Sequence, residues 1–257
     1  MKKKVLYIHQ YFNTLSMSGS TRSYEQAKRL VAAGYEVTVF TASRSRQSRL
    51  FRVEEVDGIK VIWCSGQYSN EMGFYRRILS FLKFTLFSSL FVIFKKYDFV
   101  LASSTPLTVS VPGIISSFRV KTKFIFEVRD LWPEIPIALG VLKSPFLIHL
   151  SRRLERFAYS RADKIIALSP GMASGVAKFE KKNEKIVVIP NGADNSAYEA
   201  KSIDKNYLRR KLGLPKEIKV FVYCGAFGFV NGLSYLVELA ERSRGFENIV
   251  FVAVGDG

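Results

Sequence analysis

The side chains best suited to chemistry gather in one short segment, residues 127–134, which reads EVRDLWPE. Carboxylates and a guanidinium are costly to bury unless they pair with one another or face a ligand. One interpretation is a structural ion pair that holds a loop in place. The other is that Glu127, Arg129 and Asp130 act on a polar substrate, with Trp132 as a flat apolar surface beside it. The residues alone leave both interpretations open.

A second candidate for ligand binding lies near the N-terminus. Gly19, Ser20 and Arg22 stand at the start of a helical pattern over residues 21–33, where free backbone N–H groups can receive an anion. The segment is not a GxGxxG motif, and a simple helix-capping turn would also explain it. His9 ends the preceding apolar run and can reach the same place. Since no cluster of metal-ligating residues stands out, we expect neither a metal nor a cofactor.

These side chains need a scaffold, and the apolar pattern supplies one. Apolar runs alternate with helical patterns, which predicts an α/β domain with a doubly wound parallel sheet, of the Rossmann type. The expected strands are 5–10, 36–41, 59–64, 99–102, 124–128, 164–168 and 186–189, and the expected helices are 21–33, 74–96, 107–118, 145–159 and 171–181. Ligands of such sheets bind beyond the carboxyl ends of the strands. Ser169 and Asn191, in the loops after the last two strands, therefore join the candidate binding residues.

The chain divides into two predicted domains. Residues 1–195 form the Rossmann-like domain, and residues 196–257 begin a second one with a strand at 220–224, a loop opened by Gly225, a helix at 233–243 and a strand at 249–254. One βαβ unit of this size cannot bury both faces of its sheet. We therefore expect the second domain to be incomplete, as if the chain were cut off.

Composition favours a folded protein with an anionic partner. Of 257 residues, 48% are hydrophobic, which excludes overall disorder, and 39 basic against 22 acidic residues give a net charge of +17. The two cysteines, Cys64 and Cys224, are far apart and suit a reducing cytosol. No nucleic-acid-binding motif accompanies the charge, so we expect no nucleic acid partner.

One segment points to a membrane surface instead. Residues 78–94 are mainly Ile, Leu, Phe and Val, with basic residues at both edges and one inside, and are short for a transmembrane span. They suit a helix buried against the sheet, a helix at an anionic membrane interface, or both on different faces. The predicted membrane contacts are Arg76, Arg77, Lys83, Phe84, Phe87, Lys95 and Lys96.

Five sequence blocks, in order, resemble one family. They are Gly19, the run GYEVTV at 34–39, FEVRDLWPE at 126–134, ADKIIALS at 162–169 and IPNGAD at 189–194. Together they resemble the retaining glycosyltransferases of family 4, which have the GT-B architecture of two Rossmann-like domains. Within the family, the chain looks most like bacterial enzymes that build O-antigen, capsule or exopolysaccharide on lipid carriers.

The resemblance implies a division of labour. The N-terminal domain would receive a lipid-linked saccharide acceptor, and the C-terminal domain would hold a nucleoside diphosphate sugar. Gly19 would face the donor phosphates, Arg129 stands where many members have a histidine in the sugar pocket, and Gly225 would open the donor-side loop. Transfer would proceed with retention, by front-face attack assisted by the leaving diphosphate. The protein would be cytoplasmic and peripheral on the inner face of the cell membrane.

Two departures from the family leave an alternative. The family's Lys-Gly on the donor loop reads Asn231-Gly232, and its E-x(7)-E segment would lie beyond Gly257. The alternative is a non-catalytic half that binds acceptor and membrane and works with a partner chain that completes the second domain.

Overall fold

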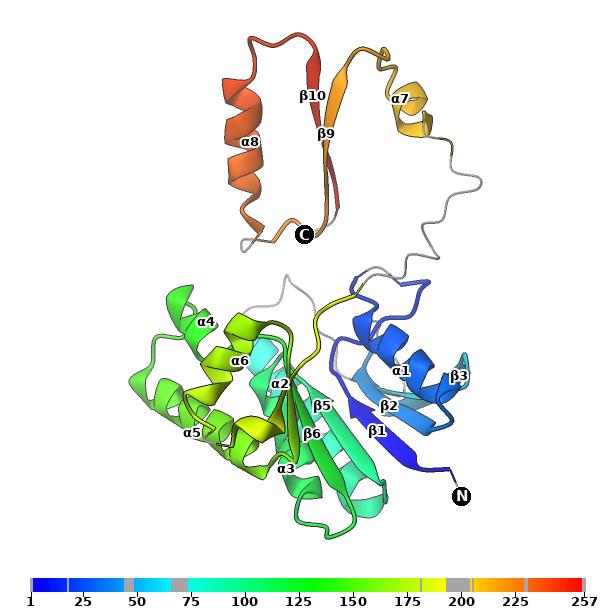
Figure 1. The fold of residues 1–257 in the computed structure, drawn as a ribbon, viewed down its shortest axis with the longest axis vertical. Coiled ribbons are helices and arrows are strands. Elements are labelled where there is room, and N and C mark those ends of the chain that lie inside the picture. Colours follow the sequence, from blue (N-terminus) through cyan, green and yellow to red (C-terminus); the bar gives the residue numbers. More distant parts are fainter. Residues whose placement is uncertain are drawn as a thin grey trace. The chain divides into compact units, whose positions relative to one another are not determined.

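The computed structural model describes residues 2–17, 19–43, 49–65, 74–180, 182–192, 204, 206–228 and 231–255. The chain forms two compact units, residues 1–192 and 193–257, and each is described by itself (Figure 1). The domain boundary predicted after residue 195 falls outside the described ranges.

The first unit is built on one eight-stranded sheet in the order β3-β4-β2-β1-β5-β6-β7-β8. The strands are β1 (Lys4–Ile8), β2 (Glu36–Ala42), β3 (Phe51–Val56), β4 (Ile59–Cys64), β5 (Phe99–Ser103), β6 (Lys123–Val128), β7 (Lys164–Ala167) and β8 (Ile186–Val188). All neighbouring strands are parallel except β3 and β4. The predicted doubly wound α/β architecture is confirmed.

Strand β3 was not predicted from the sequence, whose apolar runs indicate a wholly parallel sheet. It pairs antiparallel with β4 through a tight turn at Asp57 and Gly58, both of which have positive φ values, 50° and 75°. A two-residue turn of this kind joins hairpin strands, and Asp-Gly is its usual sequence. As an edge strand with charged residues, β3 is largely exposed, so it lacks the apolar run by which the other strands were found.

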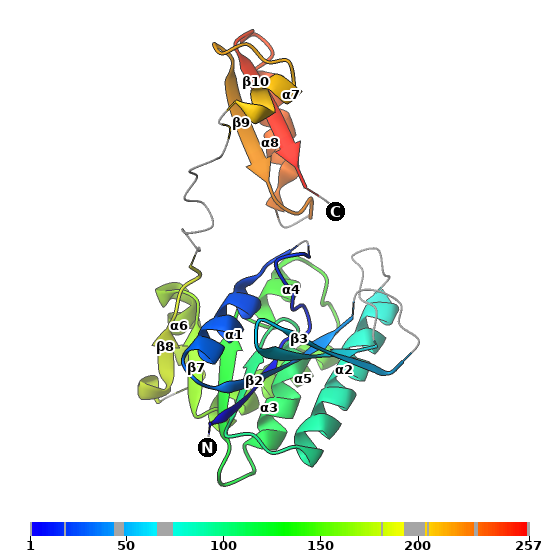
Figure 2. The same ribbon diagram turned by 90° about the vertical axis from the view of Figure 1, so that its right-hand side faces the viewer.

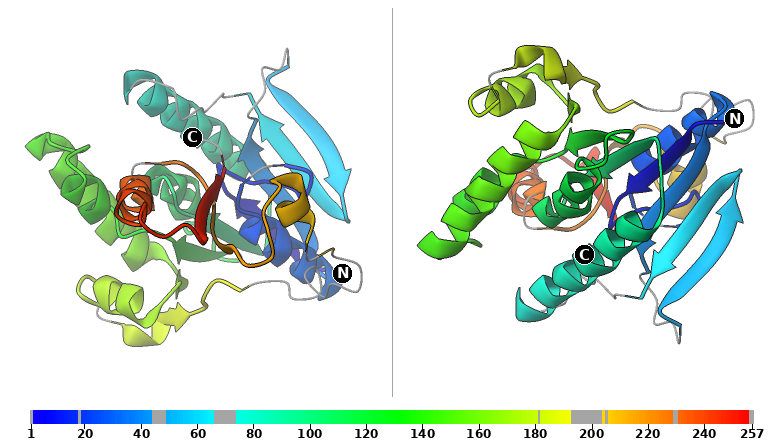
Figure 3. Two further views of the ribbon diagram at one scale, coloured as in Figure 1. Left: turned by 90° about the horizontal axis from the view of Figure 1, so that it is seen from above. Right: turned by 90° about the horizontal axis from the view of Figure 1, so that it is seen from below.

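Helices cover both faces of the sheet, with different partners on each face. Helix α1 (Arg22–Ala32) packs on the face that carries Val5 and Tyr7 of β1. The opposite face, which carries Leu6 and Ile8, is covered by α2 (Phe74–Phe94), α3 (Ser110–Ser116) and α5 (Pro145–Arg161), which lie side by side (Figures 2 and 3). The shorter helices are η1 (Leu107–Val109), α4 (Glu134–Ala138), α6 (Pro170–Ala177) and η2 (Asn183–Lys185).

Helix α2 has one face in the core and another in solvent. Phe84 and Val92 are 2% and 1% exposed, so Phe84 was wrongly assigned to membrane contact: it packs against Phe40 beneath the helix. Phe87 and Arg77 are half-buried, whereas Arg76, Lys83, Lys95 and Lys96 are exposed. By length and composition alone, the helical segment Arg76–Phe94 could cross a membrane, and it is the one such helix in the described part of the chain.

The solvent face of α2 carries a row of apolar side chains, here called the apolar stripe. Its members are 41–65% exposed. They are Leu79, Leu82, Leu86, Leu90 and Ile93. This spacing places all of them along one side of the helix.

The second unit is small and open. It contains α7 (Tyr207–Lys211), β9 (Lys219–Cys224), α8 (Leu233–Arg242) and β10 (Ile249–Val254), with β9 and β10 parallel. None of its described residues is buried, and Phe221 and Val254 are about half exposed. Two strands with one long helix therefore leave the apolar side chains of this sheet accessible.

Candidate functional site

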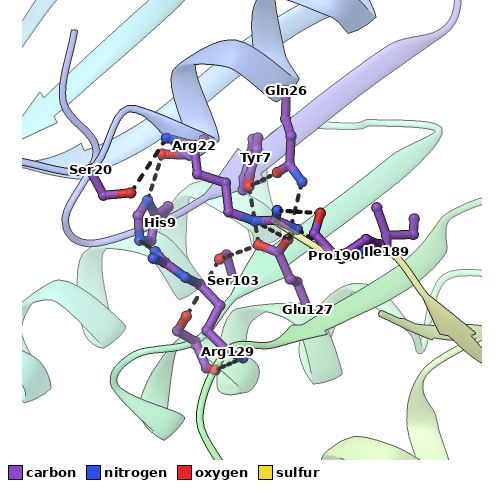
Figure 4. A network of polar contacts seen from close by, with 12 residues as sticks. Tyr7, His9, Ser20, Arg22, Gln26, Ser103, Glu127, Arg129, Ile189 and Pro190 are labelled. Atoms are coloured by element: carbon purple, nitrogen blue, oxygen red, sulfur yellow. Dashed lines mark hydrogen bonds and ion pairs between the residues drawn. The ribbon is translucent and has the colours of Figure 1, made fainter. Parts of the chain in front are cut away.

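The candidate site lies at the carboxyl ends of β1, β5 and β6, which are neighbours in the sheet (Figure 4). The chain runs from β1 to β2 on one side and later enters β5 on the other, so the strand order reverses between β1 and β5. This is the point where open α/β sheets bind ligands. His9, Ser103 and Arg129 all project from loops or strand ends at this place.

Glu127 is the best-satisfied carboxylate of the site. Its Oε2 accepts from Ser103 Oγ at 2.5 Å and lies 3.2 Å from the Tyr7 hydroxyl. Its Oε1 accepts from Arg22 Nη2 at 2.7 Å, Arg22 Nε at 3.1 Å and Gln26 Nε2 at 3.2 Å. Glu127 is fully buried. It was predicted to be catalytic, and the structure corrects this: both oxygens are already bonded inside the protein.

The ionisation of Glu127 follows from these partners. Burial alone would raise the pKa of its carboxyl group, but the hydrogen bond from Ser103 and the charge of Arg22 outweigh burial and hold the pKa below its usual value. Glu127 is therefore a buried anion at neutral pH. Its role is to position Arg22.

Arg22 is likewise a structural residue rather than the predicted substrate ligand. Its side chain is 10% exposed and is held by Glu127. The remaining donors reach the segment after β8: Nη1 donates to the Pro190 carbonyl at 3.2 Å and Nη2 to that of Ile189 at 3.4 Å. Arg22 thus ties the start of α1 to β6 and to the end of the first unit.

His9 was predicted to touch substrate, but it is 1% exposed and supports Arg129 instead. Its Nε2 lies 3.1 Å from Arg129 Nη1, and its Nδ1 lies 2.8 Å from Ser23 Oγ. Because a guanidinium can only donate, Nε2 accepts from Arg129 and the imidazole proton lies on Nδ1. Burial, with the charge of Arg129, lowers the pKa of His9 to about 3. A neutral imidazole therefore orients the Arg129 guanidinium.

Arg129 and Asp130 are the two predicted catalytic residues that remain accessible. Both are half-buried. The Arg129 backbone N–H donates to Ser104 Oγ at 2.9 Å, and Asp130 Oδ2 accepts from Thr105 Oγ1 at 2.6 Å. Among the described residues Asp130 Oδ1 has no hydrogen bond, so one oxygen of this carboxylate is free to accept from a ligand.

The loop before α1 is shaped by a glycine. Gly19 has a φ of 123°, a conformation that side chains disfavour. Asn13 Nδ2 holds the loop by donating to the carbonyls of Tyr11 and Ser20, at 3.3 and 3.2 Å. Ser20 Oγ accepts from the Arg22 backbone N–H at 3.5 Å. The side chain of Thr21, the residue at the N-cap position, forms no capping hydrogen bond. The start of α1 is thus suited to receive an anion.

The other predicted binding residues make no side-chain hydrogen bond to this cluster within the described residues. Trp132 is half-buried and packs on the core. Ser169 is the N-cap of α6 and accepts from the Met172 N–H at 3.2 Å, and Asn191 is exposed after β8. Gly225 belongs to the second unit, where its N–H donates to the Val254 carbonyl at 3.0 Å.

Several hydrogen-bond partners in the site were not predicted from the sequence. Ser103, Ser104 and Thr105 follow directly on the predicted strand at 99–102, so the rule that sites lie beyond strand ends could have found them. Tyr7 and Gln26 carried no such signal, since each belongs to a regular pattern. Within the described residues no group of three or more His, Cys, Asp or Glu side chains could hold a metal ion.

Comparison with known proteins decides the family. Residues 19–192 match the glycosyl transferase 4-like domain. The chain belongs to this family. One relative is WcaI of Escherichia coli strain K12, described as a colanic acid biosynthesis glycosyl transferase. It is 23% identical to this chain over 250 residues, which are 91% of this chain and 61% of that protein. O-antigen chain mannosyltransferase C of Escherichia coli is 30% identical over 117 residues, covering 46% of this chain and 29% of that protein.

Solved structures share the fold of this chain. Anabaena Alr3699/HepE in complex with UDP and glucose matches with a TM-score of 0.58 and 19% identity, covering 99% of this chain and 61% of that one. The architecture is accordingly that of GT-B proteins. The chain spans about three fifths of the length of WcaI and of HepE.

Proposed function

We propose that this chain is the acceptor-side part of a retaining, nucleotide-sugar-dependent glycosyltransferase of bacterial cell-surface polysaccharide biosynthesis. The observation that carries the proposal is that Arg129 and Asp130, adjacent in the chain, are both partly accessible at the carboxyl edge of the sheet, where the N-terminus of α1 also lies. The family match and the names of the relatives, which refer to colanic acid and O-antigen, support the reaction class.

The chemistry follows from charge. When a nucleoside diphosphate leaves, negative charge develops on the β-phosphate oxygen that was bonded to the anomeric carbon of the sugar. A fixed guanidinium and helix N–H groups stabilise this charge. Arg129 is suited to this role because neutral His9 fixes one of its nitrogens without cancelling its charge. Asp130 keeps one oxygen for a sugar hydroxyl. Glu127 is unsuited to be a nucleophile for a double displacement because it is buried and fully bonded, which favours front-face attack.

The donor proposed is a nucleoside diphosphate sugar, and the acceptor a saccharide on a lipid carrier. The solved HepE structure holds UDP and glucose, which supports a nucleotide-sugar donor for the family fold. A lipid-linked acceptor would require the protein to work at the membrane. We place it on the inner face of the cell membrane, as a peripheral protein.

The surface of α2 supports that membrane attachment. The apolar stripe lies between exposed cations, Arg76 and Lys83 near its beginning and Lys95 and Lys96 at its end. Lys83 is held by Ser65 Oγ at 3.2 Å, and its ammonium lies 5.9 Å from the centre of the Phe87 ring. An apolar row flanked by cations is the arrangement by which helices lie in the interface of anionic membranes.

The transfer activity is tested with the protein at its full encoded length. Membranes carrying lipid-linked saccharides are incubated with a panel of radiolabelled nucleotide sugars, and the anomeric configuration of the product is read by NMR. We expect Arg129→Gln to lower the transfer rate about 100-fold, with little change in melting temperature. Arg153→Gln, at an exposed arginine of α5, is the matched control and should remain active. Equal rates for both variants would refute the site, and membrane binding without any transfer would favour the non-catalytic alternative.

Membrane attachment is tested separately by vesicle co-sedimentation. Replacing Leu82 and Leu86 by Ser should weaken binding to vesicles with phosphatidylglycerol about tenfold or more, because each substitution removes exposed apolar surface that would be buried in the membrane. The control is Leu15→Ser with Val53→Ser, which removes equally exposed apolar side chains elsewhere. Equal binding by the two double variants would show that the stripe is not the attachment surface.

A further inference from the structure

The amino-terminal edge of the sheet, opposite the candidate transfer site, contains a basic groove of about 620 Å³. Its lining comes from the start of β1, the connection from α2 to β5 and the connection from α3 to β6. Its lining residues are Lys2, Lys4, Lys96, Tyr97, Asp98, Arg119, Val120, Lys121 and Thr122. The same strands separate the groove from the transfer site by roughly 16 Å, the length of β1.

The groove has an excess of positive charge that the protein does not neutralise. Lys2, Lys96 and Lys121 are exposed and form no ion pair within the described residues. Asp98 is the one carboxylate of the lining, and its Oδ2 is already engaged by the Lys4 backbone N–H at 2.7 Å. The Lys4 ammonium has a long contact of 3.7 Å with Glu36 outside the groove. Such an arrangement attracts an anion.

Arg119 removes the main obstacle to anion binding. The groove lies at the C-terminus of α2, where free carbonyl groups carry partial negative charge. The Arg119 guanidinium donates to two of them, to the Lys95 carbonyl at 2.6 Å and to that of Ile93. It therefore screens the helix end and fixes one wall of the groove. The Thr122 hydroxyl donates to the Tyr97 carbonyl at 2.9 Å and so joins the connection from α3 to β6 to the connection from α2 to β5.

One exposed apolar side chain lines the groove, and two more are close in sequence to residues that line it; they indicate what kind of anion it faces. Phe94, Phe118 and Val120 are 77%, 66% and 98% exposed. Phe94 directly follows Ile93, the last member of the apolar stripe, so the groove continues the surface proposed to meet the membrane. A small soluble anion needs no apolar rim. A lipid headgroup does, because its phosphate is joined to acyl chains.

We propose that this groove binds the phosphate of an anionic phospholipid headgroup, with Phe94 and Val120 beside its acyl chains. The choice of a phospholipid as the ligand rests on the membrane attachment proposed above. Lys96 and Lys121 approach the phosphate, and the α2 apolar stripe continues along the same membrane surface toward the transfer site. Since α2 runs antiparallel to the strands over about 31 Å, it connects the groove at one edge of the sheet with the site at the other.

The first test uses soluble lipid and no membrane. The ¹⁵N-labelled chain is titrated with dihexanoyl phosphatidylglycerol, with dihexanoyl phosphatidylcholine and with inorganic phosphate. We expect saturable amide shifts at residues 96–98 and 119–122 with phosphatidylglycerol, and at least fivefold weaker binding of the other two probes. Absence of these shifts would overturn the proposal. Equal affinity for inorganic phosphate would also overturn it, since the groove would then be a site for free anions.

The second test separates the groove from attachment in general. Lys96→Gln with Lys121→Gln should lower binding to phosphatidylglycerol vesicles about tenfold, because both cations lie in the groove. The control, Lys28→Gln with Lys60→Gln, removes the same charge from exposed residues elsewhere and should lower binding less than twofold. Equal losses would overturn the groove while leaving attachment standing. Soluble-lipid shifts at the groove without any vesicle binding would support the groove and reject attachment.

Discussion

His9 gives the site a definite dependence on pH. Burial lowers its pKa to about 3 in the folded chain, against 6.5 for an ordinary histidine. Between these two pH values the unfolded chain binds more protons than the folded chain. The contribution of neutral His9 to the free energy of unfolding is therefore complete above pH 6.5 and is lost as the pH falls toward 3. From pH 7.5 to 5.0 this histidine should cost about 2 kcal/mol of the free energy of unfolding.

The measurement for His9 is urea denaturation at pH 7.5 and 5.0, compared with His9→Gln, whose amide oxygen can still accept from Arg129. We expect the variant to lose about 2 kcal/mol less than the native chain over this interval. The same pH dependence in both proteins would contradict the burial of a neutral imidazole.

Glu155 on α5 shows the opposite dependence. It is 2% exposed, its Oε1 accepts from the Tyr159 hydroxyl at 2.8 Å, and its Oε2 has no hydrogen-bond partner among the residues that the structure describes. Burial raises its pKa to about 7, so its contribution is complete below about pH 4.5 and is lost as the pH rises through 7. Glu155→Gln should raise the melting temperature at pH 8 by a few degrees and give no gain at pH 5. A gain of equal size at both pH values would show that charge is not the cause.

At the residue scale, sequence patterns predicted the right segment but not the role of each side chain in it. Glu127 and Arg129 lie two residues apart and share one face of the strand pattern, yet β6 ends at Val128 between them. Glu127 is therefore covered by α1, whereas Arg129 reaches the open edge. The predicted strand already ended at Val128, but the sequence pattern does not show that Arg22 of α1 contacts Glu127, and this tertiary contact decides the two roles.

At the element scale, the ion pair between α1 and β6 should be essential for stability. Glu127→Gln keeps the shape of the side chain but leaves Arg22, whose side chain is 10% exposed, without a countercharge. Removal of one partner of a buried pair costs about 3–5 kcal/mol. Chemical denaturation should show this loss. In the double variant with Arg22→Met, which carries no buried charge, we expect a smaller loss; a larger one would argue against the pair.

The packing of α3 on β6 depends on one glycine. A Cβ on Gly113 would lie 2.1 Å from Phe124 Cε2, and Phe124 is completely buried. Gly113→Ala should therefore destabilise the first unit by about 1–3 kcal/mol, since the ring must move within a packed core. The control is Gly171→Ala in α6, where a Cβ meets no atom closer than 3.9 Å. Equal melting temperatures for both variants would contradict this packing.

Elements were predicted where the apolar pattern was strong. The strand at 59–64 and the start of the long helix at residue 74 agree with β4 and α2. The missed elements are short or exposed: β3 alternates charged and apolar residues at an edge, and α4 covers only Glu134–Ala138 after a proline. Exposed elements need no continuous apolar run, so pattern reading cannot find them with the same ease.

At the scale of the whole molecule, the two units should differ in local stability. The first unit has two clusters of buried side chains, one on each face of its sheet, whereas no described residue of the second unit is buried. Hydrogen exchange should therefore be slow at amides of β1 and β5 and at least 100-fold faster at those of β9 and β10. Equal protection in both units would mean that the second sheet is covered in solution.

The anchoring of Ile189 and Pro190 by Arg22 fixes the place where the chain leaves the first unit. This exit lies beside the start of α1, at the same sheet edge as Arg129. Insertions or deletions after Gly192 would thus change the number of residues that follow the first unit, while Ile189 and Pro190 stayed in place. Loss of the Arg22 contacts would instead free Ile189 and Pro190, so the number of residues after Gly192 can vary more freely in evolution than Arg22 itself.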